Sequence, residues 1–127
     1  MKRLFTVGRC LFALSFACTA ISAKAADQPA TVKGWVLDSA CAFTKNLKKP
    51  ISSECAVSCA RAGSPLVILT DSGTIYWPIS SLMPAKGQNE RLMEFAGKRV
   101  LATGKTFVRG GSHALVIENI EAQRAGK

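Results

Sequence analysis

The chain has 127 residues, of which 48% are hydrophobic, 7% aromatic and 20% charged. Its 17 Lys and Arg residues outnumber its 8 Asp and Glu residues, which gives a formal net charge of +9. This composition excludes a disordered chain, a collagen-like repeat and a coiled coil. The length is sufficient for one small globular domain and too short for two.

The first 25 residues have the pattern of a secretory signal peptide. Basic residues precede a mostly apolar run, residues 10–21, which is too short to span a bilayer. A small-x-small triplet, residues 23–25, follows this run, and it predicts cleavage after Ala25. The mature protein, residues 26–127, is then expected in the periplasm or outside the cell. A buried N-terminal helix and a lipid anchor at Cys18 are the two alternatives.

Cleavage would change the charge balance of the chain. It removes four of the 17 basic residues and none of the 8 acidic residues, so the mature protein carries a net charge of +5. A moderately positive surface of this kind keeps an exported protein soluble. The basic residues are scattered and do not alternate with aromatic residues, so we expect no nucleic-acid binding. No later apolar stretch has the length of a transmembrane helix, and we expect no membrane anchor after cleavage.

The mature segment begins with a predicted strand, a loop and a helix. Apolar and polar side chains alternate over residues 31–38, which predicts a strand, and Gly34 within it suggests a bulge or a sharp bend. Residues 41–50 are predicted to form a basic loop. Ser52 or Ser53 can cap a short helix that runs to about Ala62, and Gly63 suits the left-handed conformation at the end of that helix.

A hairpin is the clearest feature of the middle of the chain. Residues 66–70 are continuously apolar, which predicts a buried strand. Residues 71–73, with the sequence Asp-Ser-Gly, predict a turn. The returning strand is expected over residues 74–79, with Pro78 at its edge or end.

The last third of the chain predicts a short helix and a second hairpin. Asn89 can cap a helix over residues 90–96. Residues 98–108 and 112–120 then predict two strands joined by a glycine turn at residues 109–111. In regular alternation, the last strand would place these residues on one face: Ala114, Val116, Glu118 and Ile120.

The order of these elements is that of an OB-fold. We expect a mainly β, single-domain protein built as a small five-stranded OB-like barrel. A short cysteine-bearing helix would follow the first strand, and a short helix would lie between the third and fourth strands. This prediction covers the whole mature chain, residues 26–127.

Three segments also resemble a group of small exported bacterial proteins of unknown function. They are Val36–Cys41, which reads VLDSAC, Cys55–Ala60, which reads CAVSCA, and Gly63–Leu66, which reads GSPL. The resemblance implies a barrel fold. It implies no particular activity, so it does not help to choose a mechanism.

The mature chain keeps three cysteines, Cys41, Cys55 and Cys59, which is an odd number for an oxidising compartment. On a helix, Cys55 and Cys59 share one face, and their Cα–Cβ bonds are nearly parallel, which makes a disulfide between them awkward. Cys41 can approach that face from the preceding segment. We therefore expect a structural disulfide from Cys41 to either Cys55 or Cys59, stabilising the fold by about 3 kcal/mol in the chain-entropy model.

A soft-metal site is the first alternative for the same cysteines. Three thiolates, or two thiolates with His113, can hold copper as Cu(I), or zinc. Cys55, Cys59 and His113 resemble the copper ligands of exported copper chaperones for cytochrome oxidase assembly. This chain departs from that family, because it lacks the order of a thioredoxin-like fold and has no proline after Cys59. In the absence of a metal, His113 is expected to face the solvent from its strand.

Thiol–disulfide exchange is the second alternative. A thiolate at Cys55 or Cys59 would attack a disulfide, with its pKa lowered by a nearby cation or by the start of the helix. The lack of a Cys-x-x-Cys motif argues against this chemistry. Other catalytic signals are weak, because a turn cap explains Asp38 and Ser39 and the chain has no phosphate loop or nucleophile elbow.

Three aromatic residues, Trp35, Tyr76 and Trp77, are candidates for a binding face on the barrel. Taken together, the sequence predicts a small, non-catalytic binding or interaction module that needs no cofactor. Its partner would be a periplasmic protein or a small ligand, and a monomer is expected.

Overall fold

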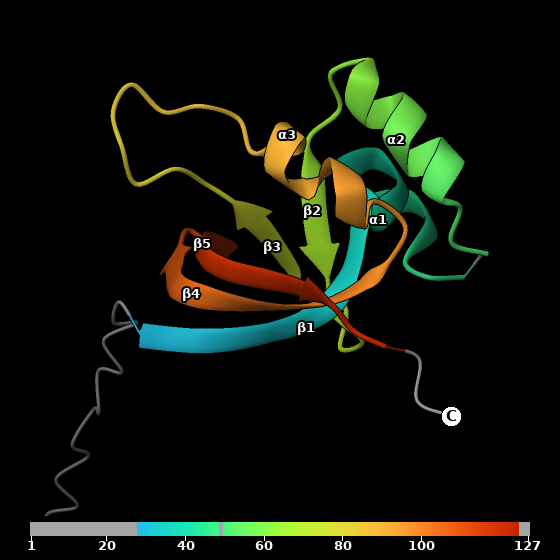
Figure 1. The fold of residues 1–127 in the computed structure, drawn as a ribbon. Helices are drawn as coiled ribbons and strands as arrows, with labels where there is room; N and C mark the ends of the chain where they lie inside the picture. The colour runs from blue at the N-terminus through green and yellow to red at the C-terminus, as the bar shows by residue number, and fades with distance from the viewer. Residues whose placement is uncertain (1–27, 49, 125–127) are drawn as a thin grey trace, which may run out of the picture.

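The computed structural model describes residues 28–48 and 50–124, so the predicted signal peptide lies outside the described residues. Five strands and several short helices follow one another along the chain (Figure 1). Their bounds are β1 Gln28–Asp38, α1 Ser39–Lys45, α2 Ser53–Arg61, β2 Leu66–Leu69, β3 Ile75–Pro78, α3 Asn89–Leu92, the 3₁₀ helix η1 Met93–Phe95, β4 Arg99–Arg109 and β5 Ser112–Ala122. Within the described ranges, every helix is too short or too polar to cross a membrane.

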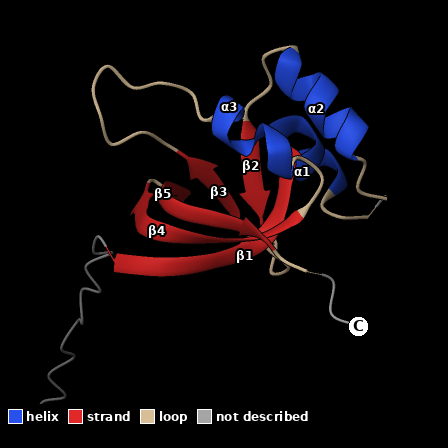
Figure 2. Ribbon diagram, in the orientation of Figure 1, coloured by secondary structure: helices blue, strands red, loops and turns tan. Residues whose placement is uncertain are grey.

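The strands form a closed barrel in the order β1-β2-β3-β5-β4, with β4 returning to β1. β3 and β5 pair in parallel, and the other neighbours are antiparallel. The helices gather over one end of this barrel (Figure 2). The predicted five-stranded OB-like barrel is therefore confirmed.

The bend predicted at Gly34 marks the place where β1 changes its partner. The first part of β1 pairs with β4, the last part pairs with β2, and Trp35 belongs to both ladders. A Cβ atom on Gly34 would lie 2.5 Å from the carbonyl oxygen of Leu69. Only glycine lets the two backbones approach this closely, and the barrel closes around this contact.

A bulge in β5 overturns one expectation about its faces. The register shifts at the step from Thr103 to Gly104 in β4, which leaves Glu118 as an extra residue in β5. Regular alternation is therefore interrupted. The residues that are buried or packed against the interior are Leu115, Ile117 and Ile120. The prediction that Ala114, Val116, Glu118 and Ile120 share one face was wrong for this reason.

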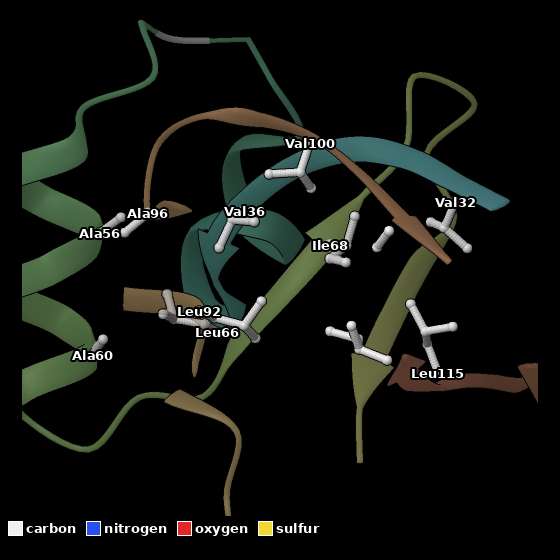
Figure 3. Packing of buried hydrophobic residues seen from close by; sticks show 12 residues of the cluster. Val32, Val36, Ala56, Ala60, Leu66, Ile68, Leu92, Ala96, Val100 and Leu115 are labelled. Atoms are coloured by element: carbon white, nitrogen blue, oxygen red, sulfur yellow. The ribbon is translucent and has the colours of Figure 1, made fainter. Parts of the chain in front are cut away.

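Two apolar clusters hold the molecule together, one inside the barrel and one outside it. The interior cluster combines strand residues with Ala56 and Ala60 of α2 and with Leu92 of α3, so these helices close one end of the barrel (Figure 3). The outer cluster contains Leu37, Ala42, Val67 and Leu69. Strand β2 is thus covered on both faces, which explains why it is continuously apolar.

The segment predicted as a basic loop, residues 41–50, instead begins within a helix. Helix α1 starts directly after β1, and the Oδ1 atom of Asp38 caps it by accepting a hydrogen bond of 3.1 Å from the backbone N–H of Cys41. The helix ends at Asn46, which has a positive φ of 43°. Burial of Ala42 in the outer cluster stabilises a helix of seven residues, a length that is marginal in isolation.

Asn89 also has a role other than the predicted helix cap. Helix α3 begins at Asn89, and its N-cap residue makes no side-chain capping bond. The Asn89 amide instead joins three segments: Oδ1 accepts a 2.8 Å hydrogen bond from the N–H of Leu66, and Nδ2 donates to the carbonyl oxygens of Ser64 (2.8 Å) and Ala60 (3.3 Å). These bonds attach the end of α2 and the start of β2 to α3.

Candidate functional site

Two of the three cysteines occupy equivalent positions at the starts of two helices. Cys41 is the third residue of α1, and its N–H binds the capping side chain of Asp38. Cys55 is the third residue of α2, and its N–H donates a 3.2 Å hydrogen bond to the Oγ atom of Ser52. The two caps fix the first turn of each helix and thereby the position of each thiol.

Cys41 and Cys55 line the same small cavity. Its volume is about 20 Å³, which is room for about one water-sized group. The other residues that line it are Leu37, Asp38, Lys45, Leu47, Pro50, Ile51, Ser52 and Ala56. Cys55 is exposed at this cavity, whereas Cys41 is half-buried. The structure thus places the thiols of two separate helices at one apolar pocket.

Cys59 lies one helical turn after Cys55 in α2, and the two thiols interact. Desolvation raises the pKa of the Cys59 thiol above its ordinary value of 9.0, and the negative charge of Asp38 raises it further. The neighbouring thiols Cys55 and Cys41 act in the same direction. The raised pKa disfavours the thiolate form of Cys59, which is the form that acts as a nucleophile.

No disulfide bond joins the three cysteines in the part of the chain that the structure describes. The alternative metal site is not assembled either. Residues 28–48 and 50–124 contain no group of three or more His, Cys, Asp or Glu side chains that could hold a metal ion. His113 lies in β5 beside β3 and lines a different groove from Cys41 and Cys55. The predicted ligand set of Cys41, Cys55, Cys59 and His113 is therefore not brought together as one cluster, and the soft-metal alternative stays a prediction.

A second candidate site lies on the outer face of β3. The rings of Phe43, from α1, and Trp77, from β3, have centroids 6.2 Å apart and planes inclined at 40°. This separation is within the range of favourable aromatic pairs. Phe43 nevertheless remains 65% exposed, which is unusual for so large an apolar side chain beside a partner.

The aromatic pair borders an open groove of about 400 Å³. The groove runs between the turn that joins β2 to β3 and the turn that joins β4 to β5. Its lining residues are Phe43, Gly73, Thr74, Ile75, Trp77, Gly110, Gly111, Ser112 and His113. None of these is Lys, Arg, Asp or Glu. OB-folds commonly bind ligands on the face of strands 2 and 3, bordered by the β1–β2 and β4–β5 connections. Phe43 lies in the β1–β2 connection and Gly110 lies in the β4–β5 turn, so the groove shares both of these borders.

The three aromatic residues predicted from the sequence have separate roles in the structure. Trp77 borders the open groove beside Phe43. Tyr76 packs against the interior cluster, with its ring 5.4 Å from that of His113 in an edge-to-face arrangement. Trp35 packs against the outer cluster and lines a more basic groove with Lys98, Arg99 and Arg124.

Phe43 was missed because it lies in the segment predicted as a loop. The available signal was local: an alanine and an aromatic residue follow Cys41 directly. If this segment had been predicted as a helix, Ala42 would have been expected to face the barrel and Phe43 to project beside it.

Comparisons with protein-family models, with curated proteins and with solved structures find no match for this chain. The features of the molecule that bear on function are the thiol pocket, lined by Cys41 and Cys55, and the aromatic groove, bordered by Phe43 and Trp77. The resemblance to small exported bacterial proteins stays a prediction.

Proposed function

We propose that the protein is an exported, non-catalytic binding module that holds a neutral, ring-shaped ligand of the sugar class in the groove beside Phe43 and Trp77. The single observation that carries this proposal is the exposed Phe43 ring, held against Trp77 at the edge of an open groove. An aromatic surface of this kind stacks on the flat face of a ring.

The chemistry of the groove favours an uncharged ligand. A nucleic-acid backbone needs cationic side chains to neutralise its phosphates, and the residues that line the groove include no Lys or Arg. Thr74 and Ser112 supply hydroxyl groups, and His113 supplies a ring nitrogen, all of which can hydrogen-bond to sugar hydroxyls. Glycines at both turns leave the backbone open to close approach.

A fluorescence titration tests this proposal directly. Trp77 borders the groove, so its emission should change when a neutral oligosaccharide from a panel binds. Loss of one stacking ring costs about 1–3 kcal/mol, so Phe43→Ala should weaken binding by about 5- to 150-fold. Leu82→Ala is the matched control, because Leu82 is 76% exposed and lies outside the groove.

Three outcomes would contradict the proposal. The first is equal affinity in Phe43→Ala and the parent protein. The second is a preference for a single-stranded oligonucleotide over every oligosaccharide. The third is no binding to any member of the panel, as judged also by amide chemical shifts of the glycine turns. Export is tested separately by the N-terminal sequence of the purified protein, which should begin at Ala26.

A further inference from the structure

We propose that Cys41 and Cys55 form a dithiol that reacts with low-molecular-weight disulfides and closes into a disulfide joining α1 to α2. This inference does not depend on the aromatic groove or on its ligand. It selects one of the two pairings that the sequence left open, and it assigns a separate role to each of the three cysteines.

The geometry of the pocket favours this pair. Cys41 and Cys55 come from different helices and line one cavity of about 20 Å³. Cys55 and Cys59 are in contact, but they lie four residues apart on α2. Their Cα–Cβ bonds are nearly parallel, and the geometry of a disulfide bond requires the two to face each other.

The exposure of Cys55 and Cys41 differs, and this difference assigns them different roles. Cys55 attacks the small disulfide first, and Cys41 then attacks the mixed disulfide formed on Cys55. Cys55 is exposed, and a disulfide in solution can reach its sulfur atom. Cys41 is half-buried at the same pocket and is placed to react with a sulfur already attached to Cys55. Cys59 does not line this cavity, and its raised pKa disfavours the reactive thiolate, which leaves it as the spare thiol.

The reaction balances as two successive exchanges. The Cys55 thiolate attacks one sulfur of a disulfide R–S–S–R, which forms a mixed disulfide and releases one R–S⁻. The Cys41 thiolate then attacks the Cys55 sulfur, which forms the protein disulfide and releases the second R–S⁻. Each released thiolate takes up a proton that a protein thiol has lost. The protein dithiol is oxidised by two electrons, and the small disulfide is reduced to two thiols.

Glutathione disulfide is the probe for the test. The full chain is expressed and purified under reducing conditions, and its intact mass identifies the N-terminus present. After reaction with glutathione disulfide, the solution is quenched with acid. The parent protein should lose two hydrogens in mass, release two equivalents of glutathione and carry no adduct. Fragmentation of the linked peptide between Cys55 and Cys59 should locate the bond at Cys55.

Single substitutions distinguish the three roles. Cys41→Ser should stop at the first exchange and accumulate one glutathione adduct on Cys55. Cys55→Ser should lose the rapid reaction, whereas Cys59→Ser is the matched control and should form the disulfide as the parent does. A Cys41–Cys59 bond in the parent, or a disulfide that survives in Cys55→Ser and vanishes in Cys59→Ser, would overturn the assignment. If a variant fails to fold, the linked peptide of the parent still decides the pairing.

Discussion

The Cys41–Cys55 disulfide should raise the stability of the domain by an amount that its loop length determines. The closed loop spans 15 residues, for which the chain-entropy model gives about 3 kcal/mol at 25 °C. The gain depends on a native state that tolerates the bond without strain. Both cysteines already lie at one pocket on capped helix starts, so we expect most of this free energy to be realised.

Thermal unfolding of the oxidised and reduced protein measures this effect. A change of 1 kcal/mol shifts the Tm of a domain of this size by about 4–8 °C, so the oxidised form should melt about 12–24 °C higher. Circular dichroism or calorimetry, with and without a reductant, gives the two midpoints. In Cys41→Ser the reductant should have no effect on Tm.

Equal melting temperatures for the two forms of the parent protein would refute this reasoning. So would a lower Tm in the oxidised form, because it would mean that the bond distorts the native helices. A redox-dependent shift that persists in Cys55→Ser would show that another pair is responsible for the stabilisation.

Two further predictions concern backbone packing and thiol ionisation. Gly34→Ala should destabilise the fold by about 1–3 kcal/mol, because its Cβ would meet the β2 backbone at 2.5 Å. Gly87→Ala, in open space, should stay within about 0.5 kcal/mol in the same urea titration, and equal costs at both sites would contradict the close-approach argument. Asp38→Asn keeps the oxygen that caps α1 but removes a charge that raises the pKa of Cys59. At a fixed pH near 8 more of Cys59 should then be thiolate, so its alkylation should be faster than in the parent, and an unchanged or slower rate would contradict the electrostatic cause.

Local patterns predicted most of the fold correctly. The strands follow from alternation, the continuously apolar β2 from its burial on both faces, and the hairpin turns from their glycines. The serine cap of α2 was predicted as Ser52 or Ser53, because a serine oxygen near a free helix N–H is a local interaction, and the structure shows Ser52 in this role. Each of these signals involves residues that are close together in the sequence.

The errors have a different origin. Helix α1 has seven residues and depends on the burial of Ala42 against β2, which propensity alone does not reveal. The bulge at Glu118 lies opposite Gly104, where an added Cβ atom would clash with the backbone carbonyl oxygen of Val116. Asn89 has a typical capping identity, yet its amide binds backbone groups from two other segments.

For the candidate sites too, the sequence determined some properties and the tertiary structure determined others. The sequence by itself determined which residues can perform thiol chemistry or stacking, because side-chain identity sets those properties. Only the tertiary structure decided which of them meet: Cys41 with Cys55 at one pocket, Phe43 with Trp77 at one groove, and His113 apart from the thiols. The physical reason is that these contacts join segments whose separation in space depends on barrel closure and helix packing. Neither of these is encoded in the few residues around each side chain.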